Sequence, residues 1–216
     1  MSNGSDPYRI TISTWNKIAN IYQDKFMDLA IYNNSYDYFC NALSKSKASI
    51  LEIGCGPGNI TKYLLEKNPA LKILATDAAD NMIQLAKQNV PQADFELMDA
   101  RSLETIQQTF DGLMVGFCLP YLSGTDTGEL ILASRGILNE YGILYLSAIE
   151  GKKEKSGFEL GSTGDKMHVY YHNYHFLKNT LEKHHFEIIY KEKIPYQYQE
   201  TTFQQHLVVI AQKKSI

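Results

Sequence analysis

The stretch Ile50–Thr61, with the sequence ILEIGCGPGNIT, decides the fold of this chain. An apolar run ends in an acid, three glycines then alternate with other residues, and a helical pattern begins at Ile60. A strand, a glycine-rich turn and a helix in this order form the ligand-binding unit of many α/β proteins. We therefore expect this turn to hold a nucleotide-like ligand.

The same alternation continues after the glycine-rich turn. Strand-like runs LKILATD, ADFELMD, FDGLMVGF and GILYLSAI are separated by helical patterns such as DNMIQLAKQNV. Strands that alternate with helices predict a mostly parallel sheet with helices on both faces. Before the sheet, apolar residues at helical spacing predict two helices, one over Trp15–Phe26 and one over Tyr36–Leu43.

The last third of the chain breaks this alternation. KKEKSGFELGSTGDK predicts a polar loop, and Asn173 is placed to cap a short helix. FEIIYKEKI and FQQHLVVIAQK then follow with only a loop between them. Consecutive strands without a crossover helix pair antiparallel, so the sheet is predicted to end in an antiparallel pair.

Composition excludes several function classes. The net charge of −3 argues against non-specific affinity for nucleic acid or for an anionic membrane. Cys40, Cys55 and Cys118 are odd in number and form no CxxC, so neither a disulfide framework nor a zinc site is indicated. The first residues lack a signal-peptide core and no apolar run is long enough to span a membrane. We expect a cytoplasmic protein with no nucleic-acid or membrane partner.

Two acids narrow the choice of ligand. Asp77 and Asp99 end successive predicted strands, at the edge where open α/β sheets bind ligands. One carboxylate there can accept from a ribose diol, and the next can accept from an adenine amino group. A dinucleotide loop wants G-x-G-x-x-G, but Asn59 stands at its third glycine. No GK[ST] phosphate loop is present.

On these residues the chain resembles a class I S-adenosylmethionine-dependent methyltransferase, of the small-molecule group that includes ubiquinone-biosynthesis-type enzymes. LEIGCGPG is similar to the family's first motif, and ATDAADNMI, FELMDA and FDGLMVGF resemble the next three. RGILNEYGILYLS resembles the segment that leads into the fifth strand. The resemblance implies a doubly wound, mostly parallel seven-stranded sheet with an antiparallel last strand and an N-terminal helical cap.

The resemblance also implies a cofactor, S-adenosyl-L-methionine, and a set of residues that bind it. The methionine part would lie against the glycine backbone, the ribose at Asp77, and adenine between Ala78 and Met82 and against Asp99. Glu52 would hold the ammonium through water; its alternative is a solvated acid at a strand end. The implied binding residues are Tyr22, Glu52, Gly54, Gly56, Gly58, Asp77, Ala78, Met82, Asp99, Ala100, Phe117 and Cys118.

The acceptor side departs from the family pattern. FCLPYL lacks a histidine often seen after the fourth strand, Tyr141-Gly142 replaces a Gly-Gly turn, and His185 stands where glycine is usual. Methyl transfer needs a base only where the acceptor must lose a proton early. Candidate bases are His168, His172, Tyr121 and Tyr171, and no metal site is expected because Asn173 interrupts a common histidine face.

We expect one domain over residues 1–216, either as a monomer or as a homodimer. Residues 1–46 would form a helical lid, 49–150 the cofactor-binding core, and 151–216 a substrate-side loop, helix and strand pair. The expected function is methyl transfer to a small-molecule acceptor. The alternatives are a non-catalytic protein that binds the cofactor or its product and, from a different class, an NAD-dependent oxidoreductase.

Overall fold

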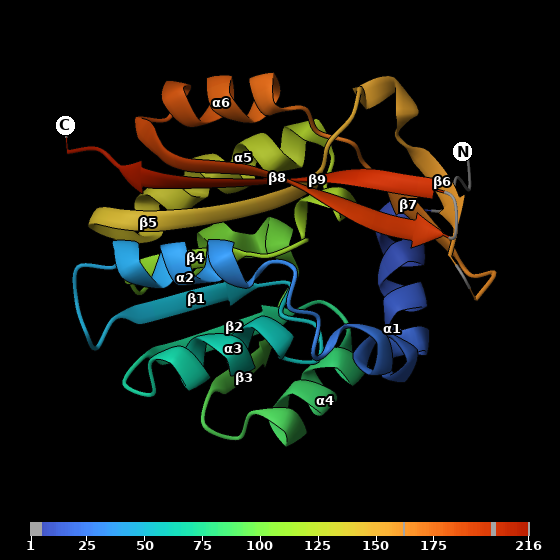
Figure 1. The fold of residues 1–216 in the computed structure, drawn as a ribbon, viewed down its shortest axis with the longest axis horizontal. Coiled ribbons are helices and arrows are strands. Elements are labelled where there is room, and N and C mark those ends of the chain that lie inside the picture. Colours follow the sequence, from blue (N-terminus) through green and yellow to red (C-terminus); the bar gives the residue numbers. More distant parts are fainter. Residues whose placement is uncertain (1–5, 162, 200–201, 216) are drawn as a thin grey trace.

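The computed structural model describes residues 6–161, 163–199 and 202–215. A seven-stranded sheet forms its centre, with strands in the order β3-β2-β1-β4-β5-β9-β8 (Figure 1). The strands of this sheet are β1 (Ser49–Ile53), β2 (Lys72–Asp77), β3 (Asp94–Leu97), β4 (Phe110–Val115), β5 (Leu138–Ile149), β8 (Phe186–Gln199) and β9 (Thr202–Lys213).

Strand direction places the functional edge of the sheet. β1 to β5 run parallel, so their carboxyl ends meet at one edge. β9 lies between β5 and β8 and is antiparallel to both; the loop lengths predicted the antiparallel pairing of β8 with β9. The glycine-rich turn after β1 and the acids that end β2 and follow β3 therefore lie at the same edge.

Helices cover both faces of the sheet and bury two apolar clusters. One face packs against α2 (Asn33–Ala42), α3 (Asn59–Lys67) and α4 (Asp80–Asn89), and the other against α5 (Gly124–Ile137) and α6 (Tyr174–Lys183). Successive residues of β5 alternate between these faces: Tyr145 joins the first cluster and Leu144 the second. This period of two is what a strand covered on both faces requires.

The first helix, α1 (Pro7–Phe26), stands apart from both layers, at the edge of the sheet (Figure 1). It packs against α4 and against a small hairpin formed by β6 (Gly157–Leu160) and β7 (Lys166–Val169). The prediction of a polar loop across this segment was wrong. Part of the hairpin is fixed by α1: Thr14 Oγ1 donates to the carbonyl of Lys166 and the His168 amide donates to Thr11 Oγ1.

Two departures from the family pattern have a backbone explanation. Tyr141 and His185, which stand where glycine is usual, adopt left-handed φ values of 60° and 57°. Glycine populates this region at little cost, whereas other residues do so rarely. The turns therefore keep their shape although the residue differs.

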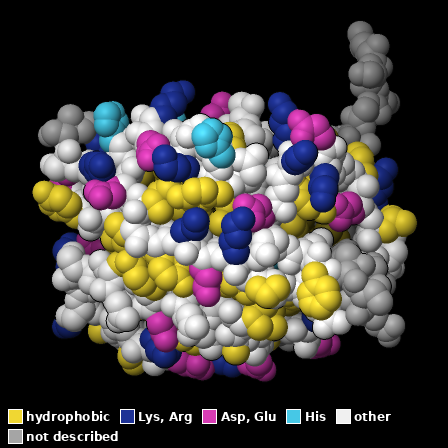
Figure 2. Space-filling view, turned by 45° about the horizontal axis from the view of Figure 1, so that its top comes forward, with side chains coloured by type: hydrophobic (Ala, Val, Ile, Leu, Met, Phe, Trp, Pro, Cys, Tyr) yellow, Lys and Arg dark blue, Asp and Glu magenta, His cyan; other side chains and the backbone are white. Residues whose placement is uncertain are grey.

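On the face drawn in Figure 2, basic and acidic side chains are interspersed with hydrophobic ones. In the part of the chain that the structure describes, every helix is too short or too polar to cross a membrane.

Candidate functional site

The glycine-rich turn is fixed to the end of β2 by its own backbone. The amides of Gly54 and Cys55 both donate to the carbonyl of Thr76, at 2.7 and 2.9 Å. Gly54, Gly56 and Gly58 all have positive φ. A Cβ at Gly54 would stand 3.1 Å from the Cβ of Cys118, so glycine here also permits the close approach of the loop after β4.

Asp77 links this turn to α4. Its two carboxylate oxygens accept from the Gly56 amide at 2.9 Å and from the Ala79 amide at 2.8 Å. Burial raises the pKa of Asp77, and the backbone donors oppose that shift. Each carboxylate oxygen has a further lone pair, so capping does not exhaust the capacity of Asp77 to accept hydrogen bonds.

Asp99 has a different environment. Arg101 donates to it from Nε at 3.0 Å and from Nη2 at 2.6 Å, and the Arg101 guanidinium lies 4.0 Å from the ring centroid of Tyr8. Burial would raise the pKa of Asp99, but the Arg101 hydrogen bonds and charge hold it below its usual value. Asp99 is thus a paired, ionised carboxylate at the mouth of the site.

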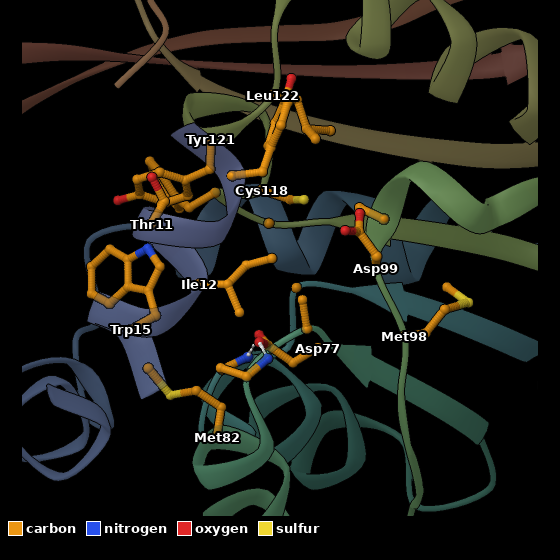
Figure 3. Close-up of a pocket in the computed structure, with 18 of the residues that line it drawn as sticks. Thr11, Ile12, Trp15, Asp77, Met82, Met98, Asp99, Cys118, Tyr121 and Leu122 are labelled. Carbon is orange, nitrogen blue, oxygen red and sulfur yellow. Dashed lines mark hydrogen bonds between the residues drawn. The ribbon is translucent and has the colours of Figure 1, made fainter. Parts of the chain in front are cut away.

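These groups enclose a first cavity of about 130 Å³ between α1 and the carboxyl edge of the sheet. Figure 3 shows Ile12 and Trp15 projecting from α1, Met82 from α4, and Asp77 with its two backbone donors. Ten of the twelve cofactor-binding residues expected from the sequence line this cavity: Tyr22, Gly54, Gly56, Asp77, Ala78, Met82, Asp99, Ala100, Phe117 and Cys118.

The other two lie outside the lining. Gly58 caps the N-terminus of α3, and a Cβ there would stand 3.3 Å from Val90 and 3.4 Å from Ala86, so its role is close packing against α4. Glu52 is only 1% exposed, which makes the alternative of a solvated acid wrong.

Glu52 is nevertheless an unusual buried group. Thr61 Oγ1 donates to its Oε2 at 2.6 Å, while no described residue donates to the buried Oε1. Burial raises the pKa of Glu52 to about 8, against the effect of the Thr61 hydrogen bond. A buried carboxyl with one unsatisfied oxygen is a suitable partner for a cation.

A second cavity of about 170 Å³ adjoins the first. Trp15, Tyr22, Phe117 and Tyr121 line both cavities, so they form a shared wall. The remaining lining is mostly apolar and comes from distant segments: α1, the start of α2, the end of β5, the β6–β7 hairpin, β8 and β9. Its charged members are Lys25 and Glu159.

The shared wall is held in a defined conformation. Trp15 packs edge-on against Tyr22 and Tyr121, each with ring centroids 5.2 Å apart. Phe117 adopts a left-handed φ of 54°, and its amide donates to Ser147 Oγ at 2.7 Å. Non-glycine residues held in this region often belong to functional sites. Phe117 and Tyr22 were anticipated from the sequence, whereas Trp15 was expected only as a helix-face residue.

The candidate bases fall in different places. Tyr121 lines both cavities. His172 is buried, and its Nε2 lies 3.0 Å from the carbonyls of Leu119 and Leu122, so it fastens the loop after β4. Burial lowers its pKa. The structure therefore brings Tyr121, but not His172, to the cavities.

His168 and Tyr171 also lie outside both cavity linings. The ring of His168 packs between Phe158 and Tyr170, with centroids 5.0 and 4.3 Å away, and burial lowers its pKa. The Tyr171 hydroxyl donates to Glu159 at 2.8 Å, which gives it a structural partner.

One histidine in the second cavity was missed by sequence reasoning. His206, on β9, is 5% exposed and lines the cavity, with its Nδ1 2.6 Å from the hydroxyl of Tyr32. Its sequence context, QQHLVVIA, reads as an ordinary buried strand. The available signal was a histidine at the start of an apolar run.

The chain is similar to several known proteins. Residues 50–142 match the family model described as "Methyltransferase domain". This match supports a class I S-adenosylmethionine-dependent methyltransferase. The chain is 30% identical over 112 residues to a putative methyltransferase, 235L, of Invertebrate iridescent virus 6. The aligned residues make up 52% of this chain and 40% of that protein.

Two further similarities agree with that family. Trans-aconitate 2-methyltransferase of Variovorax paradoxus is 30% identical over 107 residues, or 50% of this chain and 40% of that protein. The chain thus spans about two fifths of the length of these curated relatives. The fold also matches that of 1,6-didemethyltoxoflavin-N1-methyltransferase of Burkholderia thailandensis, whose structure contains 1,6-didemethyltoxoflavin and S-adenosylhomocysteine. The TM-score is 0.73 and the sequence identity 18%, and the match covers 100% of this chain and 93% of that one.

The residues present fit the family's cofactor. The first cavity combines a glycine turn, an acid at the end of β2 and apolar side chains on opposite sides, and the unsatisfied Glu52 Oε1 lies in the strand before the turn. Within the described ranges, no three histidine, cysteine or acidic side chains gather as metal ligands.

Proposed function

We propose that the chain transfers a methyl group from S-adenosyl-L-methionine to a small-molecule acceptor. The observation that supports this most is the pair of cavities joined by one aromatic wall. The first carries polar groups suited to the donor, and the second is a mostly apolar chamber suited to an acceptor. When bound, the cofactor supplies an electrophilic methyl on a positively charged sulfur, which a nucleophile displaces in line.

In this proposal the first cavity holds the donor by several separate contacts. Asp77 accepts from the ribose hydroxyls while keeping its two backbone donors, and Asp99 meets the adenine edge. Ala78 and Met82 flank the adenine ring, and Ile12 packs against the cofactor from α1. Glu52 holds the ammonium through a water molecule on its free oxygen. The backbone of the glycine-rich turn permits close approach of the cofactor. Gly58 contributes indirectly, because it allows the start of α3 to pack closely against α4.

The chain's contribution to rate is alignment and exclusion of water. Fixing two reactants in an attack geometry can supply several kcal/mol, on the order of 7–11 in the best intramolecular cases. At the boundary of the cavities Trp15 packs against Tyr22 and Tyr121, and Phe117 packs against Tyr32 and His206. Aromatic faces at this boundary also attract a sulfonium through cation–π interaction.

The domain organisation follows from the same proposal. Residues 1–46 act as a lid, because α1 supplies one wall of both cavities. Residues 49–150 form the donor-binding core, and 151–216 supply the remainder of the acceptor chamber. The whole chain acts as one domain.

Calorimetry with S-adenosylhomocysteine and with NAD tests the donor site. We expect binding of the first and none of the second, because Asn59 begins α3 where a dinucleotide loop places glycine. Binding of NAD alone would overturn the proposal. Turnover of methyl-labelled cofactor across a panel of metabolites then separates an enzyme from a non-catalytic binding protein, since only the enzyme transfers label.

A further inference from the structure

The second cavity contains a polar pair that the donor site does not use. His206 Nδ1 and the Tyr32 hydroxyl lie 2.6 Å apart, and both residues line the cavity. The imidazole is surrounded by aromatic rings: Tyr196 stacks on it at 4.7 Å between centroids, Phe117 lies at 4.8 Å and Tyr32 at 6.0 Å. Phe117 belongs to the wall shared with the first cavity, so this pair lies next to the donor side.

The second nitrogen of His206 is available to a ligand. No described residue forms a hydrogen bond with Nε2, and this atom is not among the buried polar atoms without a partner. Since His206 lines the cavity, Nε2 is the ring nitrogen through which it can meet an occupant. The Tyr32 hydroxyl can donate or accept, so the pair can present Nε2 as an acceptor, with the proton on Nδ1 directed to Tyr32.

The charge of the chamber limits what it can hold. Lys25 and Glu159 are the charged side chains of its described lining, and the Glu159 carboxylate already accepts from Tyr171. The lining is rich in aromatic rings, from Trp15, Tyr22, Phe26, Tyr32, Tyr36, Phe117, Tyr121 and Tyr196, and aliphatic side chains such as Ile18, Leu29 and Met167 complete much of it. Such a chamber suits a flat, uncharged ring system, and a single cation cannot neutralise a tricarboxylate.

We propose that the second cavity binds a flat, uncharged aromatic acceptor through one O–H or N–H group, and that His206 Nε2 accepts the hydrogen bond from that group. This inference rests on the proposed function, because it names the acceptor of the same site. The His206 ring is placed by Tyr32, Tyr196 and Phe117, and the acceptor's protic group is thereby turned toward the shared wall.

The proton of the protic group has a defined destination. The acceptor's heteroatom uses its lone pair to form the bond to the methyl carbon, and the carbon–sulfur electron pair stays on sulfur. The proton passes to His206 Nε2, which leaves a neutral methylated product and an imidazolium. Burial lowers the pKa of His206 to about 4, so the ring is neutral at pH 7 and free to accept. A weak base suffices because the heteroatom becomes strongly acidic once methylated.

The imidazolium is compatible with its surroundings. Tyr32 from the start of α2 and Tyr196 from β8 are the titratable groups that face the ring, and burial raises the pKa of Tyr32 well above its usual value. The Tyr32 phenol therefore stays neutral, and the ring faces of Tyr32 and Tyr196 can stabilise a transient cation by cation–π interaction.

Binding calorimetry on the full chain saturated with S-adenosylhomocysteine tests the inference. The probes are 2-naphthol, 2-methoxynaphthalene, which keeps the ring but lacks the proton, and trans-aconitate as a polyanion. We expect 2-naphthol to bind roughly tenfold more tightly than its methyl ether, the value of one hydrogen bond, and trans-aconitate to bind more weakly than either. His206→Phe keeps a flat ring and should abolish the preference for the hydroxyl while the methyl ether still binds.

Two further variants control this result. Tyr32→Phe should reduce the hydroxyl preference without removing it, because Nε2 remains. His175→Phe changes an exposed histidine that bonds to Asn179 and should leave all affinities unchanged. Melting curves establish that each variant is folded.

Failure of the acceptor assignment can be distinguished from failure of the proposed function. A hydroxyl preference that survives in His206→Phe, no binding of either naphthalene, or tighter binding of trans-aconitate would each overturn the inference. Separate titration with S-adenosylhomocysteine reports on the proposed function. If that ligand binds and the naphthalenes do not, only the acceptor assignment fails; if it does not bind, the proposed function fails.

Discussion

The two cavities of this protein differ in where their residues come from. Most of the first is built by four short segments at the carboxyl ends of β1, β2, β3 and β4, with α1 as a cover. The second draws on residues from Trp15 to His206. The first is therefore specified by local sequence and the second by tertiary structure. Yet each is associated with one buried titratable side chain that burial keeps neutral at pH 7: Glu52 beside the first and His206 in the second.

The largest expected effect concerns the donor side. Asp77→Ala should weaken S-adenosylhomocysteine binding by roughly ten- to a few-hundredfold, because hydrogen bonds to a charged group contribute about 1.5–3 kcal/mol each. Asp77 also caps the amides of Gly56 and Ala79, so the free protein should melt at a lower temperature. Calorimetry and melting curves measure the two effects separately.

Asp77→Asn is the matched variant, because it keeps the shape but cannot accept equally from both hydroxyls. We expect it to bind with intermediate affinity. If folded Asp77→Ala binds as tightly as the parent chain, Asp77 is only a capping residue and the donor assignment is wrong.

A second variant tests whether the wall is shared. Trp15→Ala removes two edge-on aromatic contacts, to Tyr22 and Tyr121. Aromatic pairs contribute about 0.5–1.5 kcal/mol each beyond area burial, so both S-adenosylhomocysteine and 2-naphthol should bind roughly tenfold more weakly. Leu132→Ala, at an exposed position on α5, serves as the control. Loss of affinity for one ligand alone would mean that Trp15 belongs to one cavity.

Most of the fold and much of the lining of the first cavity could be predicted from the sequence. The glycine turn, Asp77 and Asp99 follow from spacing, because the ends of successive parallel strands must lie together. The β6–β7 hairpin was missed because α1, a distant element, supplies hydrogen bonds to it. The second cavity could not be predicted for the same reason: no periodicity indicates that Tyr32 and His206, 174 residues apart, will meet.

A smaller effect on stability should distinguish glycine in the strained turn from glycine inside a helix. Gly56→Ala places a Cβ at a φ of 54°, 3.5 Å from the Tyr22 ring, and left-handed backbone costs a non-glycine residue about 1–2 kcal/mol. Gly128→Ala, inside α5 with open space around its added Cβ, should instead stabilise the protein by about 0.5–1 kcal/mol. Denaturant unfolding measures both free energies. Equal signs would contradict the backbone argument for the turn.

The smallest expected signal is a proton count at Glu52. The pKa of this carboxyl rises from its ordinary 4.5 to about 8 in the folded protein. The folded state therefore binds a proton that the unfolded state has lost, and stability should fall as the pH rises from about 4.5 to 8 and then level off. A ligand ammonium beside Oε1 would favour the ionised form, so binding of S-adenosylhomocysteine at pH 7 should release up to about one proton. Calorimetry in buffers of different ionisation enthalpy counts it.

The control ligand is 5′-methylthioadenosine, which has the nucleoside and sulfur but no ammonium, and which should release none. Glu52→Gln should remove the release seen with S-adenosylhomocysteine and flatten the pH dependence of stability. Glu187→Gln, at an exposed position on β8, should change neither. If both ligands release the same number of protons, the ammonium does not meet Glu52. The buried acid would then be a feature of the fold alone, and the likeness between Glu52 and His206 would end at their burial.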